Sequence, residues 1–191
     1  METLRTFIAI ELSTNVQNAI STIEDGLKKT GADVKWVKPA NIHLTLKFLG
    51  DTPVDKIEPI SKALEICGLS IAPFALELTC LGAFPKIDSA KVVWLGVTNG
   101  KEEAKQLALT IQEKLGEIGL PKEEREFEPH LTLGRVRSPL NRFALIEAVK
   151  ACQITEPITL AVDHITLIKS VLTPQGPIYE VLKRFELKAA A

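Results

Sequence analysis

The tetrapeptide His-Leu-Thr-Leu occurs twice in this 191-residue chain, beginning at His43 and at His130, and these are two of its three histidines. Imidazole titrates near neutral pH, so histidine is the usual proton donor or acceptor in an enzyme. Two histidines in matched settings can supply an acid and a base to one reaction. The repeated tetrapeptide therefore predicts acid–base catalysis by His43 and His130.

Each histidine lies in a segment that reads as a β-strand, 41–49 for the first copy and 127–136 for the second. Because side chains alternate between the two faces of a strand, His43 should share a face with Thr45, and His130 with Thr132. The intervening leucines then face the core. A single His-x-Thr would most simply be structural, but two identical copies favour a functional face.

The two copies are 87 residues apart (130 − 43), and the same offset relates 6–11 to 93–98, another pair of strand-like segments. The chain therefore reads as a duplicated unit, about 3–81 and then 91–162, with the order strand, helix, histidine strand, helix, strand. The predicted strands are 4–11, 41–49, 73–81, 92–98, 127–136 and 158–162, and the predicted helices are 14–30, 54–67, 101–118 and 140–151. Expected N-caps are Ser13 and Asn99, and expected helix stops are Gly31, Gly68 and Gly119.

Beyond the second unit, 163–187 alternates as a hairpin around the turn 173–177. We expect an α+β fold with two pseudo-symmetric lobes, each an antiparallel-type sheet with helices outside, enclosing a central cleft. Both His-x-Thr faces should turn toward that cleft. Residues 1–188 would then form one bilobal domain, and 189–191 a tail.

The composition is that of a compact soluble enzyme, with 46% hydrophobic residues and a net charge of −1. The near-neutral charge argues against broad electrostatic capture of nucleic acid, so an anionic substrate must be held locally. No apolar run approaches the ~20 residues that span a membrane, and no signal-peptide pattern is present, so we expect a cytoplasmic protein. Cys67, Cys80 and Cys152 lack metal-ligand spacing and are expected to be buried, reduced thiols.

Three segments, 5–11, 36–50 and 127–136, closely resemble the bacterial and archaeal RNA 2′,3′-cyclic phosphodiesterases. These belong to the two-histidine phosphoesterase superfamily and are also called LigT-like 2′-5′ RNA ligases. The resemblance spans nearly the whole chain and includes the loop 82–85 and the strand 91–96. At Lys91 the family commonly has arginine, so this chain lacks a bidentate contact there.

The resemblance implies hydrolysis of a 2′,3′-cyclic phosphate at an RNA end to a 2′-phosphomonoester, without metal or cofactor. In some members it also implies reversible 2′-5′ joining of RNA ends. By analogy with the family, His43 is the proton donor and His130 the proton acceptor, while Thr45 and Thr132 would donate hydrogen bonds to phosphate oxygens. The expected partners are RNA ends bearing the cyclic phosphate, including tRNA fragments, with no membrane partner. One chain assembles the whole site, so we expect a monomer.

Three further side chains are candidate substrate contacts. Simple alternation places Lys47 on the His43 face, where it could bind phosphate. Arg135 would lie opposite His130 unless Gly134 marks a bulge, and is carried over as a phosphate or RNA-backbone contact. Phe84, in the loop, could stack on a terminal base, whereas Phe48 is assigned to the packing face.

A third match to the motif, His164-Ile-Thr-Leu, lies in the hairpin outside the duplicated units and is interpreted as structural. Other functions are left open. A metal-dependent phosphodiesterase is disfavoured because neither catalytic histidine has metal-ligand spacing. A non-catalytic RNA-end binding protein, or a phosphodiesterase acting on a small cyclic nucleotide, would use the same residues.

Overall fold

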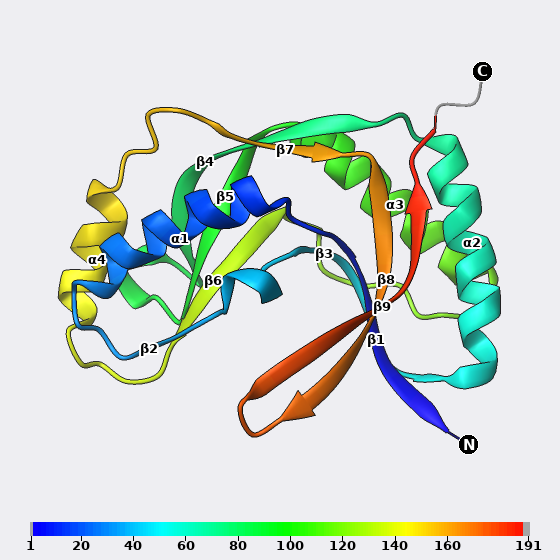
Figure 1. The fold of residues 1–191 in the computed structure, drawn as a ribbon, viewed down its shortest axis with the longest axis horizontal. Coiled ribbons are helices and arrows are strands. Elements are labelled where there is room, and N and C mark those ends of the chain that lie inside the picture. The colour runs from blue at the N-terminus through cyan, green and yellow to red at the C-terminus, as the bar shows by residue number, and fades with distance from the viewer. Residues whose placement is uncertain (1, 189–191) are drawn as a thin grey trace.

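The computed structural model describes residues 2–188, so the predicted tail 189–191 lies outside the described residues. It contains two antiparallel sheets and four α-helices within that range, as the α+β prediction requires. Figure 1 shows α1 (Thr14–Lys28) and α4 (Arg142–Ala151) at one end of the molecule. At the other end are α2 (Ile57–Ser70) and α3 (Lys101–Glu117), with the strands between the two helix pairs.

The four-stranded sheet has the order β3-β1-β8-β9. Its strands are β3 (Leu44–Pro53), β1 (Thr3–Ile10), β8 (His164–Thr173) and β9 (Gly176–Glu186). The five-stranded sheet has the order β2-β6-β5-β4-β7. Its strands are β2 (Val34–Trp36), β6 (His130–Val136), β5 (Val92–Asn99), β4 (Phe74–Phe84) and β7 (Ile158–Val162). Short 3₁₀ turns complete the chain at η1 (Pro39–Asn41), η2 (Val54–Lys56) and η3 (Ile87–Ser89).

The two predicted units do not each build a sheet of their own. Strand β4 belongs to the first unit by sequence but pairs with β5 and β7 of the second. Its place beside β1 is taken by β8 of the predicted hairpin. The short connection from β4 to β5 favours this antiparallel pairing of consecutive strands. The five-stranded sheet therefore combines strands of both predicted units, and the hairpin completes the four-stranded sheet.

One continuous hydrophobic core joins the sheets to the helices. It contains Ile8 and Leu44 from the four-stranded sheet and Leu95 and Leu131 from the five-stranded sheet, all fully buried. The leucine face of each histidine strand therefore packs inward, as alternation predicted. The opposite faces of the same strands are free to carry polar side chains.

Helix ends follow the predicted signals with two exceptions. Ser13 caps α1 by accepting a hydrogen bond from the Val16 amide at 3.4 Å. The N-cap of α3 is Gly100 rather than Asn99. Gly68 does not end α2, which continues to Ser70; a Cβ there would lie 2.4 Å from the Glu186 carbonyl oxygen. This glycine permits close approach of α2 to β9.

Candidate active site

The His43 ring is held between two aromatic side chains of the four-stranded sheet. Phe7 of β1 stacks against it with ring centroids 4.6 Å apart and an interplanar angle of 29°. Tyr179 of β9 meets it edge-on at 5.2 Å. Its Nδ1 lies 2.8 Å from the backbone oxygen of Asn41, two residues earlier. These contacts fix both the position and the rotation of the imidazole.

The His130 ring has a matching arrangement on the five-stranded sheet. Phe84 of β4 meets it edge-on at 5.0 Å, and Trp94 of β5 lies 6.3 Å away. Its Nδ1 lies 2.7 Å from the backbone oxygen of Glu128, again two residues earlier. The same local geometry therefore occurs at both copies of the tetrapeptide.

These contacts determine which ring nitrogen can react. A carbonyl oxygen only accepts hydrogen bonds, so Nδ1 of both His43 and His130 must carry a proton and donate it. Among residues 2–188, neither Nε2 has a hydrogen-bond partner. Each Nε2 is thus available to take a proton when the ring is neutral or to give one when it is charged.

The threonines lie on the histidine faces, as alternation predicted. Thr45 pairs with Ala9 of β1, on the face that carries Phe7. Thr132 pairs with Trp94, whose indole lies close to His130. Both threonines are half-buried, and no hydrogen bond of either hydroxyl occurs within the described part of the chain. Each hydroxyl is therefore free to donate to a ligand.

Two glycines allow Trp94 to lie against the sheet beside His130. A Cβ at Gly82 would lie 2.2 Å from the indole, and a Cβ at Gly96 would lie 2.6 Å from it. Any larger residue at either position would displace the ring. The indole in turn lies against Phe84, with ring centroids 5.3 Å apart, so the aromatic support of His130 is itself packed in place.

Strands β3 and β6, which carry the two copies of the motif, contact each other. Burial raises the pKa of Tyr179, while the nearby charges of Arg135 and Arg5 oppose that rise. Tyr179 touches His43, and Arg135 belongs to the His130 strand, so one region contains side chains from both sheets.

A bulge in β6 decides where Arg135 points. Thr132 pairs with Trp94, but Gly134 pairs with Val93, which leaves Leu133 as the extra residue. Arg135 therefore pairs with Val92 and shares the face of Thr132 and His130. Strict alternation would have put Arg135 on the opposite face. The sequence suggested a bulge near Gly134 as the exception, and a bulge does occur there.

A bulge in β3 overturns two predictions about that strand. Thr45 pairs with Ala9 and Lys47 with Ile8, so Leu46 is the extra residue and Lys47 lies on the face opposite Thr45. Lys47 is 4% exposed and its Nζ donates to the Pro121 carbonyl at 2.9 Å. It therefore holds the loop after α3 and does not lie on the histidine face.

The same bulge moves Phe48 out of the core. It pairs with Phe7, lies on the His43 face and is 65% exposed, with the two rings 6.0 Å apart. The assignment of Phe48 to the packing face was wrong for the same reason as that of Lys47. A single extra residue in one strand reverses the faces of the residues that follow it.

Phe84 is at the end of strand β4, not in a loop. It is half-buried and contacts the rings of both Trp94 and His130. Its position suits support of His130 better than stacking on a base.

Asn41 and Glu128, whose backbone oxygens accept hydrogen bonds from the two histidines, are themselves anchored. The Asn41 side-chain amide donates to the Pro177 carbonyl of β9 at 2.9 Å, while its backbone oxygen accepts from His43. The Glu128 carboxylate forms an ion pair with Lys101 at the start of α3. Each imidazole is thus connected through one residue to a different element of the fold.

Burial lowers the pKa of His43 from its usual value, and the hydrogen bond to Asn41 opposes that shift. In the absence of an anion, burial therefore favours the neutral ring at this position.

The third histidine belongs to a polar network instead of an open face. His164 Nδ1 contacts Asp163, and Nε2 lies 3.5 Å from Glu11 Oε2. Thr166 donates to the same carboxylate at 2.7 Å, and Arg184 binds both of its oxygens at 2.7 and 3.0 Å. The Arg184 hydrogen bond is the largest cause that lowers the pKa of Glu11, to about 2, although burial opposes it. Both ring nitrogens of His164 thus face carboxylates.

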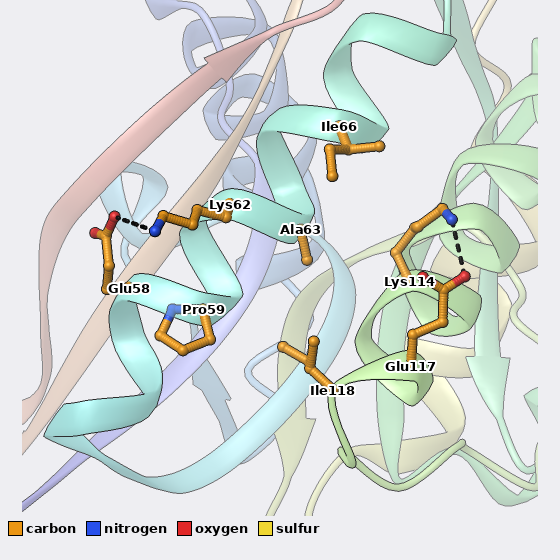
Figure 2. Close-up of a pocket in the computed structure, with 8 residues that line it drawn as sticks. All are labelled: Glu58, Pro59, Lys62, Ala63, Ile66, Lys114, Glu117 and Ile118. Atoms are coloured by element: carbon orange, nitrogen blue, oxygen red, sulfur yellow. Dashed lines mark hydrogen bonds and ion pairs between the residues drawn. The ribbon is translucent and has the colours of Figure 1, made fainter.

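A groove between α2 and α3, of about 360 Å³, lies outside these faces (Figure 2). Its rim carries the ion pairs Lys62–Glu58 at 3.8 Å and Lys114–Glu117 at 2.8 Å. No histidine or cysteine lines the groove. Its lining residues are Glu58, Pro59, Lys62, Ala63, Ile66, Lys114, Glu117 and Ile118. This composition offers no acid–base pair like that of the histidine faces.

Cysteines and metal ligands add nothing to the site. Cys67 is buried, but Cys80 is exposed and Cys152 partly so, which corrects the expectation of three buried thiols; all three are free. Within 2–188, no group of three or more His, Cys, Asp or Glu side chains could hold a metal ion. No helix in that range is long and apolar enough to cross a membrane.

Sequence reasoning did not select Phe7, Tyr179, Arg5 or Trp94 as site residues. Arg5, Phe7 and Ala9 alternate along β1, so the strand pattern could have predicted that they share one face. It could not have predicted that this is the face on which His43 lies. Tyr179 lies beside His43 because β8, the hairpin partner of β9, pairs with β1, a long-range contact without a local sequence signal. Trp94 packs against Gly82 of β4 and Gly96 of β5, and these two glycines are the sequence signal that could have indicated it.

Comparison with known proteins places this geometry in a family. Residues 7–173 match the model of the 2′-5′ RNA ligase superfamily. The RNA 2′,3′-cyclic phosphodiesterase of Methanothermobacter thermautotrophicus is 36% identical over 184 residues, covering 96% of this chain and 99% of that protein. Among solved structures, TT0787 of Thermus thermophilus has a TM-score of 0.80 at 25% identity, covering 98% of this chain and 100% of that one.

The apo structure of LigT from E. coli is similarly close, with a TM-score of 0.78 at 28% identity, covering 98% of this chain and 99% of that one. The matched family segment contains both His-x-Thr copies, and the architecture matches over nearly the whole length. The resemblance drawn from the sequence is confirmed: this chain belongs to the 2′-5′ RNA ligase superfamily.

Proposed function

We propose that this protein hydrolyses 2′,3′-cyclic phosphate ends of RNA to 2′-phosphomonoesters by metal-independent acid–base catalysis. The observation that carries the proposal is the matched pair of histidines, each with Nδ1 fixed on a carbonyl and Nε2 unpartnered within the described chain. The name of the Methanothermobacter relative supports the same substrate. The protein would act as a monomer on RNA ends such as tRNA fragments.

In the proposed reaction His130 is the base and His43 the acid. Nε2 of neutral His130 takes a proton from water as the water oxygen bonds to phosphorus. The bond from phosphorus to the ribose 3′-oxygen breaks, and that oxygen takes a proton from Nε2 of charged His43. The products are a 2′-phosphomonoester and a 3′-hydroxyl. Exchange of one proton with solvent at each ring restores the starting state.

The threonines would stabilise the negative charge of the reacting phosphate. The hydroxyls of Thr45 and Thr132 can donate to the two non-bridging phosphate oxygens, one from each sheet. These two donors favour the transition state, in which those oxygens carry more charge than in the cyclic ester. Arg135 adds a positive charge on the His130 face because of the bulge at Leu133, where it would contact a phosphate of the RNA backbone.

The environment of His43 fits an acid that is charged by its substrate. Burial lowers its pKa in the free protein, which by itself favours the neutral ring. A cyclic phosphate monoanion beside Nε2 favours the charged ring, so we expect substrate binding to raise the pKa of His43. Hydrolysis would then begin with the proton on the correct histidine.

The test is turnover of an oligonucleotide with a 2′,3′-cyclic phosphate end, in excess EDTA, with identification of the phosphomonoester. Wild type should form the 2′-phosphate, and folded His43→Ala and His130→Ala should each lose about 10²–10⁴-fold in kcat. His164→Ala is the matched control and should retain near-normal activity. Binding of the oligonucleotide without turnover would instead identify an RNA-end binding protein.

The same assay distinguishes the other reactions left open by the sequence. Turnover of nucleoside cyclic phosphates far in excess of oligonucleotide turnover would indicate a small cyclic nucleotide as the substrate. A 5′-hydroxyl oligonucleotide added to the reaction would reveal 2′-5′ joining, in which that hydroxyl replaces water as the attacking group. Loss of activity in EDTA would contradict the metal-independent mechanism.

A further inference from the structure

The short strand β2 places a second basic residue beside Arg135. Lys35 pairs with Arg135 across β2 and β6, so the two side chains emerge from the same face of the sheet. Both are exposed, and neither forms an ion pair within residues 2–188. Next to this pair, Asp33 and Arg137 form an ion pair, with Arg137 Nε 3.8 Å from Asp33 Oδ1.

Like charges directly opposite each other destabilise a pair of strands. The neighbouring Asp33–Arg137 pair shows that this ladder accommodates an acidic partner, yet the Lys35–Arg135 pair has none within the described chain. An ammonium beside a guanidinium, both on the face of Thr132, forms a concentrated positive charge that an anion would relieve. The arrangement therefore has the character of an anion-binding site.

The surroundings of this pair are also basic. The charges of Arg5 and Arg135 both act on Tyr179, and Arg5 forms no ion pair in the described chain. At the other end of β6 the loop before His130 is acidic, and Glu126 and Glu128 are paired with Lys105 and Lys101. An RNA strand would therefore be attracted toward the Lys35 end of β6 and not toward its beginning.

The position along the strand separates this pair from the reacting phosphate. Because Leu133 is the extra residue of a bulge, Arg135 lies two ladder positions beyond Thr132, which corresponds to about 7 Å along a β-strand. We propose that Lys35, together with Arg135, binds an internucleotide phosphate of the RNA strand upstream of the terminal cyclic phosphate. This inference rests on the proposed function and adds the path of the RNA chain to it.

The experiment compares a substrate that has no upstream nucleotides with one that has two. A nucleoside 2′,3′-cyclic phosphate has none, whereas a trinucleotide with a cyclic phosphate end has two. Lys35→Ala should lower kcat/KM for the trinucleotide about five- to tenfold and leave that for the nucleoside cyclic phosphate unchanged. Lys35→Arg should restore the trinucleotide value, because it keeps the charge.

Salt dependence and a matched control sharpen the test. In Lys35→Ala, the slope of log kcat/KM against log salt for the trinucleotide should be shallower by about 0.7, as expected for one lost phosphate contact to a single strand. Lys183→Ala removes an exposed lysine that pairs with Leu167 on the core-facing side of the four-stranded sheet. It should leave both substrates unaffected.

Equal losses on both substrates would overturn the proposal, because Lys35 would then act at the reacting phosphate or on folding. An unchanged trinucleotide value would overturn it as well. If wild type turned over neither substrate, the proposed function would fail, and fluorescence anisotropy with a 2′-phosphate-ended trinucleotide would test Lys35 separately. Weaker binding by Lys35→Ala than by wild type would support the phosphate site, and equal binding would refute it.

Discussion

The two histidine faces share one local design but differ in their surroundings. Both rings donate from Nδ1 to the carbonyl two residues earlier, and both have a threonine two residues later. His43 is stacked on Phe7 and its pKa is lowered by burial. His130 has only edge-on aromatic contacts at 5.0 and 6.3 Å within the described residues.

The orientation of each imidazole and its surroundings have different structural origins. The tetrapeptide and the preceding carbonyl set the tautomer and direct Nε2 outward in both copies. The packing of each ring is supplied by other strands, β1 and β9 for His43 but β4 and β5 for His130. Identical sequence segments can therefore present two imidazoles in different environments.

The largest effect among the supporting residues is expected at the threonines. Thr45→Val or Thr132→Val keeps the shape but removes one hydrogen bond to the phosphate, which should lower kcat about 10–100-fold with a small change in KM. Steady-state kinetics on the cyclic-phosphate oligonucleotide measures this. If one variant were fully active, that threonine would not be part of the proposed phosphate clamp and the two halves would not be equivalent.

The third His-x-Thr match shows that the motif alone does not make a site. Glu11→Gln should destabilise the fold by about 1–3 kcal/mol at neutral pH, because it removes the carboxylate that binds Arg184 and Thr166. Because the pKa of Glu11 is lowered to about 2, its contribution is complete above about pH 4.5 and is lost as pH falls toward 2. Denaturant unfolding of wild type and variant across that range measures the difference.

The control for Glu11 is Glu180→Gln, which removes an exposed ion pair with Lys169 at 2.8 Å and should change stability by less than about 1 kcal/mol. Equal stability of Glu11→Gln and wild type at pH 7 would show that the network around His164 does not support the fold.

A smaller effect is expected at the residues that anchor the two carbonyls. Asn41→Ala removes the hydrogen bond to the Pro177 carbonyl and frees the turn that orients His43, so kcat should fall about fivefold with little change in KM. Glu128→Gln weakens the ion pair with Lys101 on the other side and should have a smaller effect, because that pair is partly exposed.

The kinetic readout distinguishes orientation from stability. If Asn41→Ala changed only the midpoint of unfolding and left kcat unaltered, the link from β9 to His43 would be structural alone.

Much of this arrangement could be predicted from the sequence because it is local. Alternation and the repeated tetrapeptide predicted the strands, the inward leucines and the shared faces of His43 with Thr45 and of His130 with Thr132. Helix α1 begins where Ser13 predicts. These features depend on residues within a few positions of one another, and the pattern contains them.

The errors concern features that two strands determine together. Alternation within β3 cannot reveal that Leu46 is an extra residue, because a bulge is defined by the pairing with β1. It therefore misplaced Lys47 and Phe48, while the bulge at Leu133 brought Arg135 to the His130 face. The place of β8 beside β1 and the approach of Tyr179 to His43 likewise arise from long-range pairing.

Both histidines are held as Nδ1–H tautomers with Nε2 unpartnered within residues 2–188, in environments that differ. Nitrogen-detected NMR titration of wild type, with His43 and His130 assigned by substitution, tests it directly. We expect the Nδ1–H tautomer for both neutral rings and a pKa of His43 below the ordinary value of about 6.5, rising when a phosphate-ended oligonucleotide binds. An Nε2–H tautomer at either ring, or a free-protein pKa of His43 above that value, would contradict it.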